Sequence, residues 1–204
     1  ATIRRQRQMC IRDSDKVVTL LNEANQMDLS VQHPDINLCQ YDFRATDNQN
    51  IVYGLGAIKG IGRPVIEAII QARDTGGAFK DLYDLCARVD VKRVNRRALE
   101  ALVRAGALDD LGVHRASLIE SIDLALEAAN QQHRSALAGQ NDMFGIAAPA
   151  ETVQTYQQVP EWKEEDLLAA EKETLGLYLS GHPIDMYIQA VSYTHLRAHE
   201  TSEN

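Results

Sequence analysis

The run from Gly60 to Gly62 constrains this chain more than any other feature, because it separates two apolar segments. Apolar residues precede it from Leu55 to Ile58 and follow it from Val65 to Ile70. A tight turn at this point needs main-chain angles that glycine adopts at little cost. The pattern predicts a helix-hairpin-helix arrangement, in which Ile61 points inward and holds the two helices together.

A turn of this kind can bind a phosphate group. Without side chains at Gly60 and Gly62, a phosphate can approach the main chain, and the next helix offers unpaired N–H groups and its positive dipole end. Pro64 falls in the first helical turn, where its missing N–H has no cost. Lys59 and Arg63 add positive charge. These features predict that the chain binds duplex DNA independently of its base sequence and that the affinity falls as the salt concentration rises. The alternative is a plain helical corner whose glycines serve packing.

A second helix pair is predicted from Leu82 to Val89 and from Val94 to Ala105. Its turn, residues 90–93, has no glycine but lies among many basic residues, Arg88 included, and Asn95 can cap the second helix. This unit is either a degenerate second hairpin that contacts DNA or a solvated basic face. The residues predicted to bind DNA are Lys59, Gly60, Ile61, Gly62, Arg63, Lys92, Arg93, Arg96 and Arg97.

The net charge of −8 conceals a division along the chain. Residues 51–104 contain 10 basic and 6 acidic side chains, whereas residues 105–189 contain 4 basic and 14 acidic ones. A basic segment beside an acidic one suits a DNA-contacting module followed by a region with another role. Ordinary variation of surface charge gives similar numbers, so charge alone does not decide.

The remaining periodicities predict a mainly α fold with a small β-hairpin near the N-terminus and a helix near the C-terminus. Strands are expected at 41–45 and 51–53, on either side of turn-forming residues, and an extended stretch at 29–36. The expected helices cover residues 15–27, 65–73, 82–89, 94–105, 115–137 and 161–179, the fifth being long and amphipathic.

Other chemistry is not indicated. Cys10, Cys39 and Cys86 are far apart and form no CxxC pair, so neither a zinc site nor a disulfide framework is expected. No apolar run reaches the roughly 18 residues of a membrane span, and no signal peptide is evident. Asp109 and Asp110 are adjacent, and neighbours at a helix end do not converge on one metal ion. We expect no catalytic residue, metal or cofactor in this chain, no membrane association, and a cytoplasmic location.

Four separated runs, in the same order, resemble the alpha subunit family of bacterial DNA polymerase III, the C-family replicative polymerases. The runs are Tyr53–Gly60, Val94–Glu100, Arg104–Ala107 and Glu173–Pro183. The resemblance implies a layout over residues 15–191. Residues 15–53 resemble the end of the fingers region, and residues 54–112 resemble a tandem helix-hairpin-helix domain that grips duplex DNA. A long helix at 113–137 and a linker at 138–160 follow. Residues 161–191 then form a helix that leads toward an oligonucleotide-binding barrel. The family's palm, with its Mg²⁺-binding aspartates, is expected upstream.

The two ends differ from the rest. Residues 1–14 and 192–204 lack a usable apolar period and look like translated adapter sequence, so we expect non-native or disordered tails there.

The linker contains a run, residues 139–145, that resembles the family's internal motif for the sliding clamp, the beta subunit. The resemblance implies that Met143 and Phe144 fill an apolar pocket, Gln140 bonds at its edge and Asp142 lies at its rim. Asn141 departs from the family, which more usually has an apolar or small residue there. The alternative is an apolar pair that packs on the chain's own surface.

The resemblance implies part of a DNA-directed DNA polymerase, a nucleotidyltransferase of DNA replication, with duplex DNA, the sliding clamp and other polymerase III holoenzyme subunits as partners. A chain without the palm is expected to be inactive by itself. Three alternatives remain open: an error-prone C-family paralogue, a non-enzymatic helix-hairpin-helix DNA-binding adaptor, and a helical domain that binds only proteins.

Overall fold

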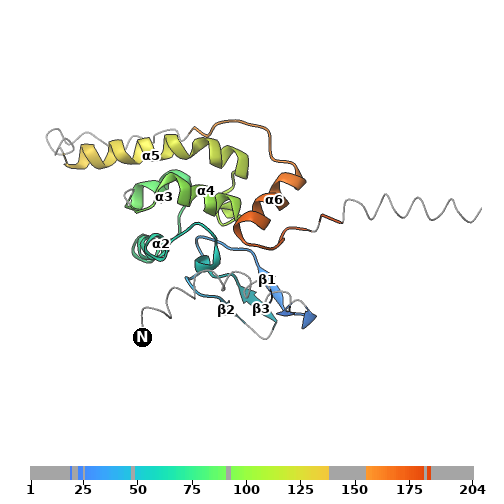
Figure 1. The fold of residues 1–204 in the computed structure, drawn as a ribbon. Helices are drawn as coiled ribbons and strands as arrows, with labels where there is room; N and C mark the ends of the chain where they lie inside the picture. The colour runs from blue at the N-terminus through green and yellow to red at the C-terminus, as the bar shows by residue number, and fades with distance from the viewer. Residues whose placement is uncertain are drawn as a thin grey trace, which may run out of the picture.

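The computed structural model describes residues 19, 23, 24, 26–46, 49–90, 93–137, 155–181, 183 and 184. The predicted tails, most of the predicted helix at 15–27, Lys92 and the clamp peptide lie outside these residues. The described part is mainly α with a small sheet near its N-terminal end, as predicted (Figure 1). Its elements are β1 (Ser30–Gln32), β2 (Arg44–Ala45), β3 (Asn50–Val52), the 3₁₀ helix η1 (Leu55–Ala57), α2 (Arg63–Gly76), α3 (Leu82–Arg88), α4 (Arg96–Arg104), the 3₁₀ helix η2 (Asp109–Leu111), α5 (Arg115–Leu137) and α6 (Glu164–Thr174).

The sheet contains the predicted β-hairpin and one further strand. β2 and β3 pair antiparallel, with Arg44 opposite Val52 and Ala45 opposite Ile51. β1 pairs parallel with the other edge of β3, so the strand order is β1-β3-β2. The sequence predicted an extended chain at β1 but no partner for it, because its partner lies about 20 residues farther along the chain.

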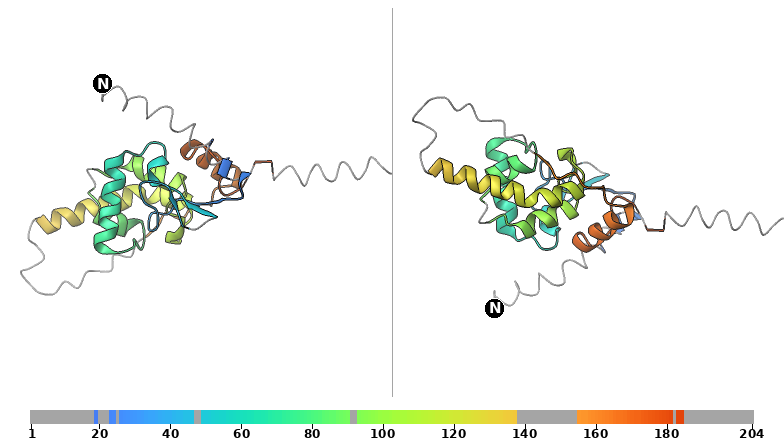
Figure 2. Two further views of the ribbon diagram at one scale, coloured as in Figure 1. Left: turned by 90° about the horizontal axis from the view of Figure 1, so that it is seen from below. Right: turned by 90° about the horizontal axis from the view of Figure 1, so that it is seen from above.

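The long helix α5 has the bounds that its apolar period predicted. It lies across α3 and α4 (Figures 1 and 2), and its buried face carries Leu118, Ile122, Ala125 and Ala129. This stripe recurs every three or four residues, which places one face of the helix against the core.

One hydrophobic core joins the N-terminal region to the helices. Ile36 and Tyr53 belong to the same cluster as Leu85, Leu99 and Leu118. A buried arginine on α2 strengthens this connection, because Nη1 of Arg73 donates to the carbonyl oxygens of Ile36 at 3.1 Å and Cys39 at 2.7 Å. The N-terminal loop and the helices therefore form one packed unit.

Several helix ends differ from the predicted bounds, among them both ends of α2, which runs from Arg63 to Gly76 and not from Val65 to Arg73. α4 begins at Arg96 and not at Val94, because Asn95 has extended main-chain angles and caps the helix, its Oδ1 accepting from the Ala98 N–H at 3.0 Å. The predicted cap is thus confirmed. α6 ends at Thr174 and not near Leu179, because Gly176 adopts a φ of +83°.

The described cysteines serve packing. Cys39 and Cys86 are buried free thiols, and burial raises the pKa of Cys86 to about 12. Sγ of Cys39 accepts a hydrogen bond from the N–H of Asp35 at 3.1 Å.

Among the helices of the described residues, none has both the length and the apolar character needed to cross a membrane.

Candidate nucleic-acid interface

The first hairpin joins η1 to α2 through residues 58–62. Its first helix is a single 3₁₀ turn at Leu55–Ala57. Gly60 has a φ of +87°, a left-handed conformation that favours glycine strongly. Gly62 caps α2 with a φ of −84°, which any residue adopts. The conformational need for glycine that the sequence suggested therefore holds at Gly60 alone.

The corner of this hairpin is open to solvent. Lys59, Gly60, Gly62 and Arg63 are exposed, and Ile61 is half-buried against the core. A Cβ on Gly60 would have only Ala101 Cβ nearby, at 3.9 Å. A phosphate group can therefore reach the main chain from outside.

Most main-chain N–H groups of the corner are unused. Within the residues that the structure covers, the N–H groups of Gly60, Ile61 and Gly62 donate to no protein atom. The N–H of Lys59 is engaged, donating to the Thr174 carbonyl at 2.9 Å and fixing the hairpin to the end of α6. Successive free N–H groups ahead of a helix form an anion-binding concavity.

Gly54 and Gly56 let the chain support this corner, and no role was predicted for either of them from the sequence. The loop at 40–43 packs against residues 54–56, where the N–H groups of Leu55 and Gly56 donate to the carbonyls of Gln40 and Tyr41, each at 2.9 Å. A Cβ on Gly54 would lie 2.6 Å from the Phe43 nitrogen. A signal was present in the closely spaced glycines at 54 and 56, which contributed only to the family resemblance.

The two basic side chains of the first hairpin differ in their contacts. Nε of Arg63 forms an ion pair with Oε1 of Glu67 at 3.1 Å, and its guanidinium lies 4.4 Å from the centre of the Tyr41 ring. The ammonium group of Lys59 forms no ion pair with any described residue. Lys59 therefore offers a free charge, and Arg63 a charge held in place.

A hollow of about 380 Å³ brings the first hairpin beside α4. Its lining consists of Lys59, Gly60, Arg97, Glu100, Ala101, Arg104, Glu173 and Thr174. Nη1 of Arg104 pairs with Oε2 of Glu173 at 2.6 Å, whereas exposed Arg97 has no acidic partner among the described side chains. Two free cations, 38 positions apart in the chain, thus border one hollow.

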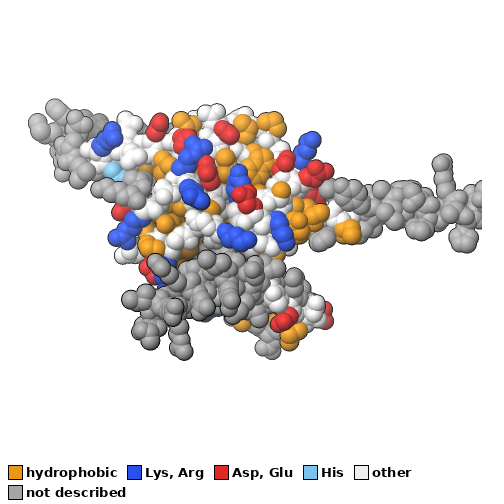
Figure 3. Space-filling model, in the orientation of Figure 1, with side chains coloured by type: hydrophobic (Ala, Val, Ile, Leu, Met, Phe, Trp, Pro, Cys, Tyr) orange, Lys and Arg blue, Asp and Glu red, His pale blue; other side chains and the backbone are white. Residues whose placement is uncertain are grey.

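Two of the basic residues predicted to bind DNA at the second turn, Arg93 and Arg96, are paired with acidic side chains. Nε of Arg93 lies 3.8 Å from Oδ2 of Asp90. Arg96 pairs with Glu100 at 2.7 Å and also with Asp123 of α5. On the face shown in Figure 3, basic and acidic side chains are interspersed over the helical part of the molecule. These pairs reduce the attraction that the second turn can exert on a phosphate.

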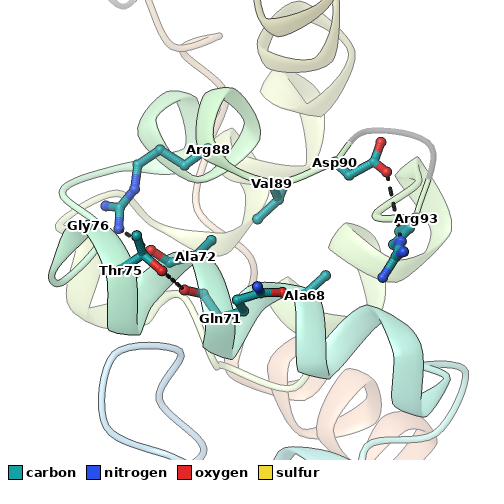
Figure 4. Close-up of a pocket in the computed structure, with 9 residues that line it drawn as sticks. All are labelled: Ala68, Gln71, Ala72, Thr75, Gly76, Arg88, Val89, Asp90 and Arg93. Carbon is teal, nitrogen blue, oxygen red and sulfur yellow. Dashed lines mark hydrogen bonds and ion pairs between the residues drawn. The ribbon is translucent and has the colours of Figure 1, made fainter.

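A larger hollow of about 530 Å³ lies between α2 and the second turn, and Arg88 reaches across its edge (Figure 4). Nη2 of Arg88 donates to the carbonyls of Ala72 and Gly77, both at 2.7 Å, and the guanidinium lies 4.5 Å from the Phe79 ring centre. Arg88 therefore holds α3 against the end of α2. Because the Arg88 guanidinium is used in these contacts, this hollow is a poorer phosphate site than the smaller hollow beside α4.

The described residues contain no group of three or more His, Cys, Asp or Glu side chains placed to hold a metal ion. Asp109, one of the two adjacent aspartates, binds the Arg115 guanidinium, with Oδ2 at 2.6 Å from Nη2. Its carboxylate serves a structural ion pair.

Known proteins resemble this chain closely. A family model described as a helix-hairpin-helix motif matches residues 28–118, which include both helix pairs. DNA polymerase III subunit alpha of Vibrio cholerae is 52% identical over 193 residues, which cover 93% of this chain and 17% of the relative. The chain is homologous to one segment of DNA polymerase III alpha subunits. The alpha subunit of Escherichia coli K12 is 49% identical, and the match covers 88% of this chain and 16% of the relative. The alpha subunit of Pseudomonas aeruginosa is 45% identical, and the match covers 87% of this chain and 17% of the relative.

The homology confirms the resemblance drawn from four short runs. The chain spans about a sixth of the length of these DNA polymerase III alpha subunits. The matched helix-hairpin-helix region contains the open corner and, except for Glu173 and Thr174, the residues that line the hollow beside α4. The roles of the individual residues in DNA binding stay predictions.

Proposed function

We propose that this chain is the part of a replicative DNA polymerase alpha subunit that holds duplex DNA by its phosphates. The observation that carries the proposal is the exposed corner at Gly60–Gly62, where three N–H groups and the nearby cations Lys59 and Arg97 have no partner among the described residues. A helix N-terminus with free N–H groups attracts a phosphate oxygen through hydrogen bonds and the helix dipole. Base edges play no part in these contacts, so every DNA sequence binds alike.

The whole protein's activity would be DNA-directed DNA synthesis in the cytoplasm. Nucleotidyl transfer needs acidic residues that hold Mg²⁺ ions, and in this proposal the palm supplies them. The segment described here contributes binding, without a cofactor of its own. By holding the duplex it keeps the primer end at a high effective concentration near the active site.

The clamp peptide is a second part of the proposal. Its residues Gln140, Asp142, Met143 and Phe144 lie outside the described residues, but the chain on both sides of the linker belongs to the helical unit. α5 precedes the linker, and after it the hydroxyl of Tyr156 accepts from the N–H of Leu82 at 3.3 Å. A peptide carried between these points would connect the sliding clamp to the DNA-binding unit.

A pull-down with the sliding clamp tests the peptide. Replacing Met143 and Phe144 with alanine should abolish clamp capture, because these two side chains provide the apolar anchor. The matched control replaces Met27, an exposed methionine that precedes the linker by more than half of the chain's length in the sequence. Equal capture by the double variant and the wild type would remove clamp binding from the proposal.

Titration of the 204-residue chain with a short duplex of random sequence, at several KCl concentrations, tests DNA binding. Lys59→Ala and Arg97→Ala should each weaken duplex binding. Each should also make the negative slope of log K (the association constant) against log salt shallower by about 0.9, the value for one phosphate contact. Arg134→Ala, near the end of α5, serves as the matched control and should leave both unchanged. If the wild type binds no duplex, or if all three variants keep its slope, DNA binding at this corner is wrong.

The alternatives make different predictions. A helical domain that binds only proteins would bind no duplex at all. A non-enzymatic adaptor would lack palm aspartates in the reading frame upstream, which sequencing of the gene tests. The names of the relatives favour the replicative subunit over an error-prone paralogue, because each of those named above is a DNA polymerase III subunit alpha.

A further inference from the structure

Arg63 is held on two sides, in contrast to Lys59 on the same turn. The guanidinium lies 4.4 Å from the Tyr41 ring centre, a distance at which the ring face attracts a cation. A guanidinium has five N–H donors, and Nε lies 3.1 Å from Oε1 of Glu67 in an ion pair. Both Nη groups remain without a partner in the described part of the chain. Arg63 therefore presents a fixed pair of donors at the start of α2.

Tyr41 is itself fixed from the opposite side. Its carbonyl accepts the N–H of Gly56 at 2.9 Å. Its ring lies so close to η1 that a Cβ on Gly56 would be 2.8 Å from Cζ and 2.9 Å from Cε2. The ring is thus confined between the main chain of η1 and the guanidinium of Arg63. On the η1 side, the ring is therefore held by main-chain packing and not by a flexible side chain.

We propose that Tyr41 is a positioning residue for DNA binding, which holds the Arg63 guanidinium ready for a phosphate of the duplex. The inference rests on the proposed DNA-binding function and adds a residue outside the helix-hairpin-helix turn to it. A free arginine side chain loses conformational entropy when it binds, and an arginine already stacked on a ring loses less. The planar guanidinium can then donate both Nη groups to one phosphate.

The stacking predicts which change at position 41 matters. Tyr41→Phe keeps the ring, and the duplex Kd should stay within about twofold of the wild type. Tyr41→Leu removes the ring face, and the Kd should rise about two- to fivefold, the range expected for an exposed cation–π contact. Fluorescence anisotropy with a labelled random-sequence duplex and the 204-residue chain measures both.

A double-mutant cycle separates positioning from general shape. If Tyr41 acts through Arg63, Tyr41→Leu has no further effect when Arg63 is already replaced by alanine. Equal weakening by Tyr41→Leu in the wild-type and Arg63→Ala backgrounds would overturn the proposal, and so would a Tyr41→Phe variant as weak as Tyr41→Leu. Circular dichroism monitors folding, and if Tyr41→Leu fails to fold, Tyr41→Met replaces it in the same cycle.

One further arm distinguishes this inference from the proposed function. Lys59→Ala tests the hairpin without involving Tyr41. If Lys59→Ala weakens duplex binding and the cycle shows no coupling, only the role of Tyr41 is wrong. If neither Lys59→Ala nor Arg63→Ala changes binding, the DNA-binding function of the hairpin fails, and the role of Tyr41 fails with it.

Discussion

Arg115 and Glu171 form a buried ion pair between α5 and α6, with Nη1 and Nη2 of the arginine 3.2 and 3.1 Å from Oε1 of the glutamate. The side chain of Glu171 is fully buried and that of Arg115 is 6% exposed. The other carboxylate oxygen, Oε2, accepts the N–H groups of Leu179 at 3.0 Å and Ser180 at 3.1 Å. One carboxylate thus joins the start of α5, the middle of α6 and the segment that follows α6.

Replacing Glu171 with glutamine should destabilise the fold. The arginine would lose one of its two carboxylate partners while staying buried, and removal of one member of a buried pair costs about 3 kcal/mol or more. Asp109 still pairs with Arg115, at 2.6 Å, so we expect the lower end of that range. Urea denaturation followed by circular dichroism measures the loss. Glu120→Gln, an exposed change on α5, should alter the unfolding free energy by less than about 0.5 kcal/mol, and an equal loss in both variants would contradict the prediction.

The same pair should make stability depend on pH. Burial alone would raise the pKa of Glu171, but hydrogen bonds from Ser180 and Leu179, together with the charge of Arg115, lower the pKa below its ordinary 4.5. Because the folded pKa is depressed, its contribution to the unfolding free energy is present in full above about pH 4.5 and is lost as pH falls through the folded value.

The unfolding free energies of the wild type and Glu171→Gln should therefore converge as the pH decreases from 5 toward 3. Urea denaturation of both proteins at a series of pH values tests this. Asp35, whose pKa burial raises, is the same in both proteins and cancels in the difference. Parallel curves over the whole range would show that Glu171 does not titrate as its contacts imply.

Local signals predicted much of the fold. α5 could be bounded because its apolar stripe, including Leu118 and Ile122, repeats along one continuous helix. The cap at Asn95 could be predicted because its partner, Ala98, is three residues away. α6 was predicted too long because Leu175 and Leu177 continue an apolar spacing, although they enter the core after the helix has ended.

Contacts between distant residues could not be predicted from the sequence. Arg115 and Glu171 are 56 residues apart, and nothing in the periodicity pairs them. The candidate site shows the same limit, because the charge of Arg96 is matched by Asp123 on another helix whereas Arg97 has no such partner in the described chain. A count of basic residues treats these two arginines alike, and only the tertiary structure separates them.

Gly54→Ala should destabilise the fold although its position is not a turn with positive φ. The new Cβ would lie 2.6 to 2.8 Å from main-chain atoms of Tyr41, Asp42 and Phe43, which cannot move as a side chain end can. Overpacking of this kind costs about 1–3 kcal/mol. Thermal denaturation measures the effect, and a melting temperature equal to that of the wild type would mean that the loop at 40–43 shifts freely.

Gly62→Ala should separate folding from DNA binding. The Cβ fits, with Pro64 Cδ at 3.6 Å as its nearest contact, and the φ of −84° suits alanine. We expect a loss of stability of about 0.5–1 kcal/mol, because alanine is a poorer helix N-cap than glycine, and a weaker duplex affinity, because the methyl group obstructs a phosphate at the free N–H groups. Gly60→Ala, which also strains a φ of +87°, should lose both stability and binding. Unchanged duplex affinity in Gly62→Ala would place the phosphate elsewhere.

Glu67→Gln should strengthen duplex binding. Glu67 pairs with Nε of Arg63 and leaves both Nη groups to a phosphate, so its main effect on binding is that its negative charge offsets that of Arg63 and repels the DNA backbone. Both side chains of this ion pair are 62% exposed, so the gain is modest, about two- to fivefold at low salt, and it fades as salt screens the charges. Anisotropy titrations at two KCl concentrations measure it, with Glu120→Gln as a control that removes the same charge from α5. Weaker duplex binding by Glu67→Gln would show that Glu67 helps to hold Arg63 for the phosphate. An equal gain in Glu120→Gln would mean that the effect comes from net charge alone.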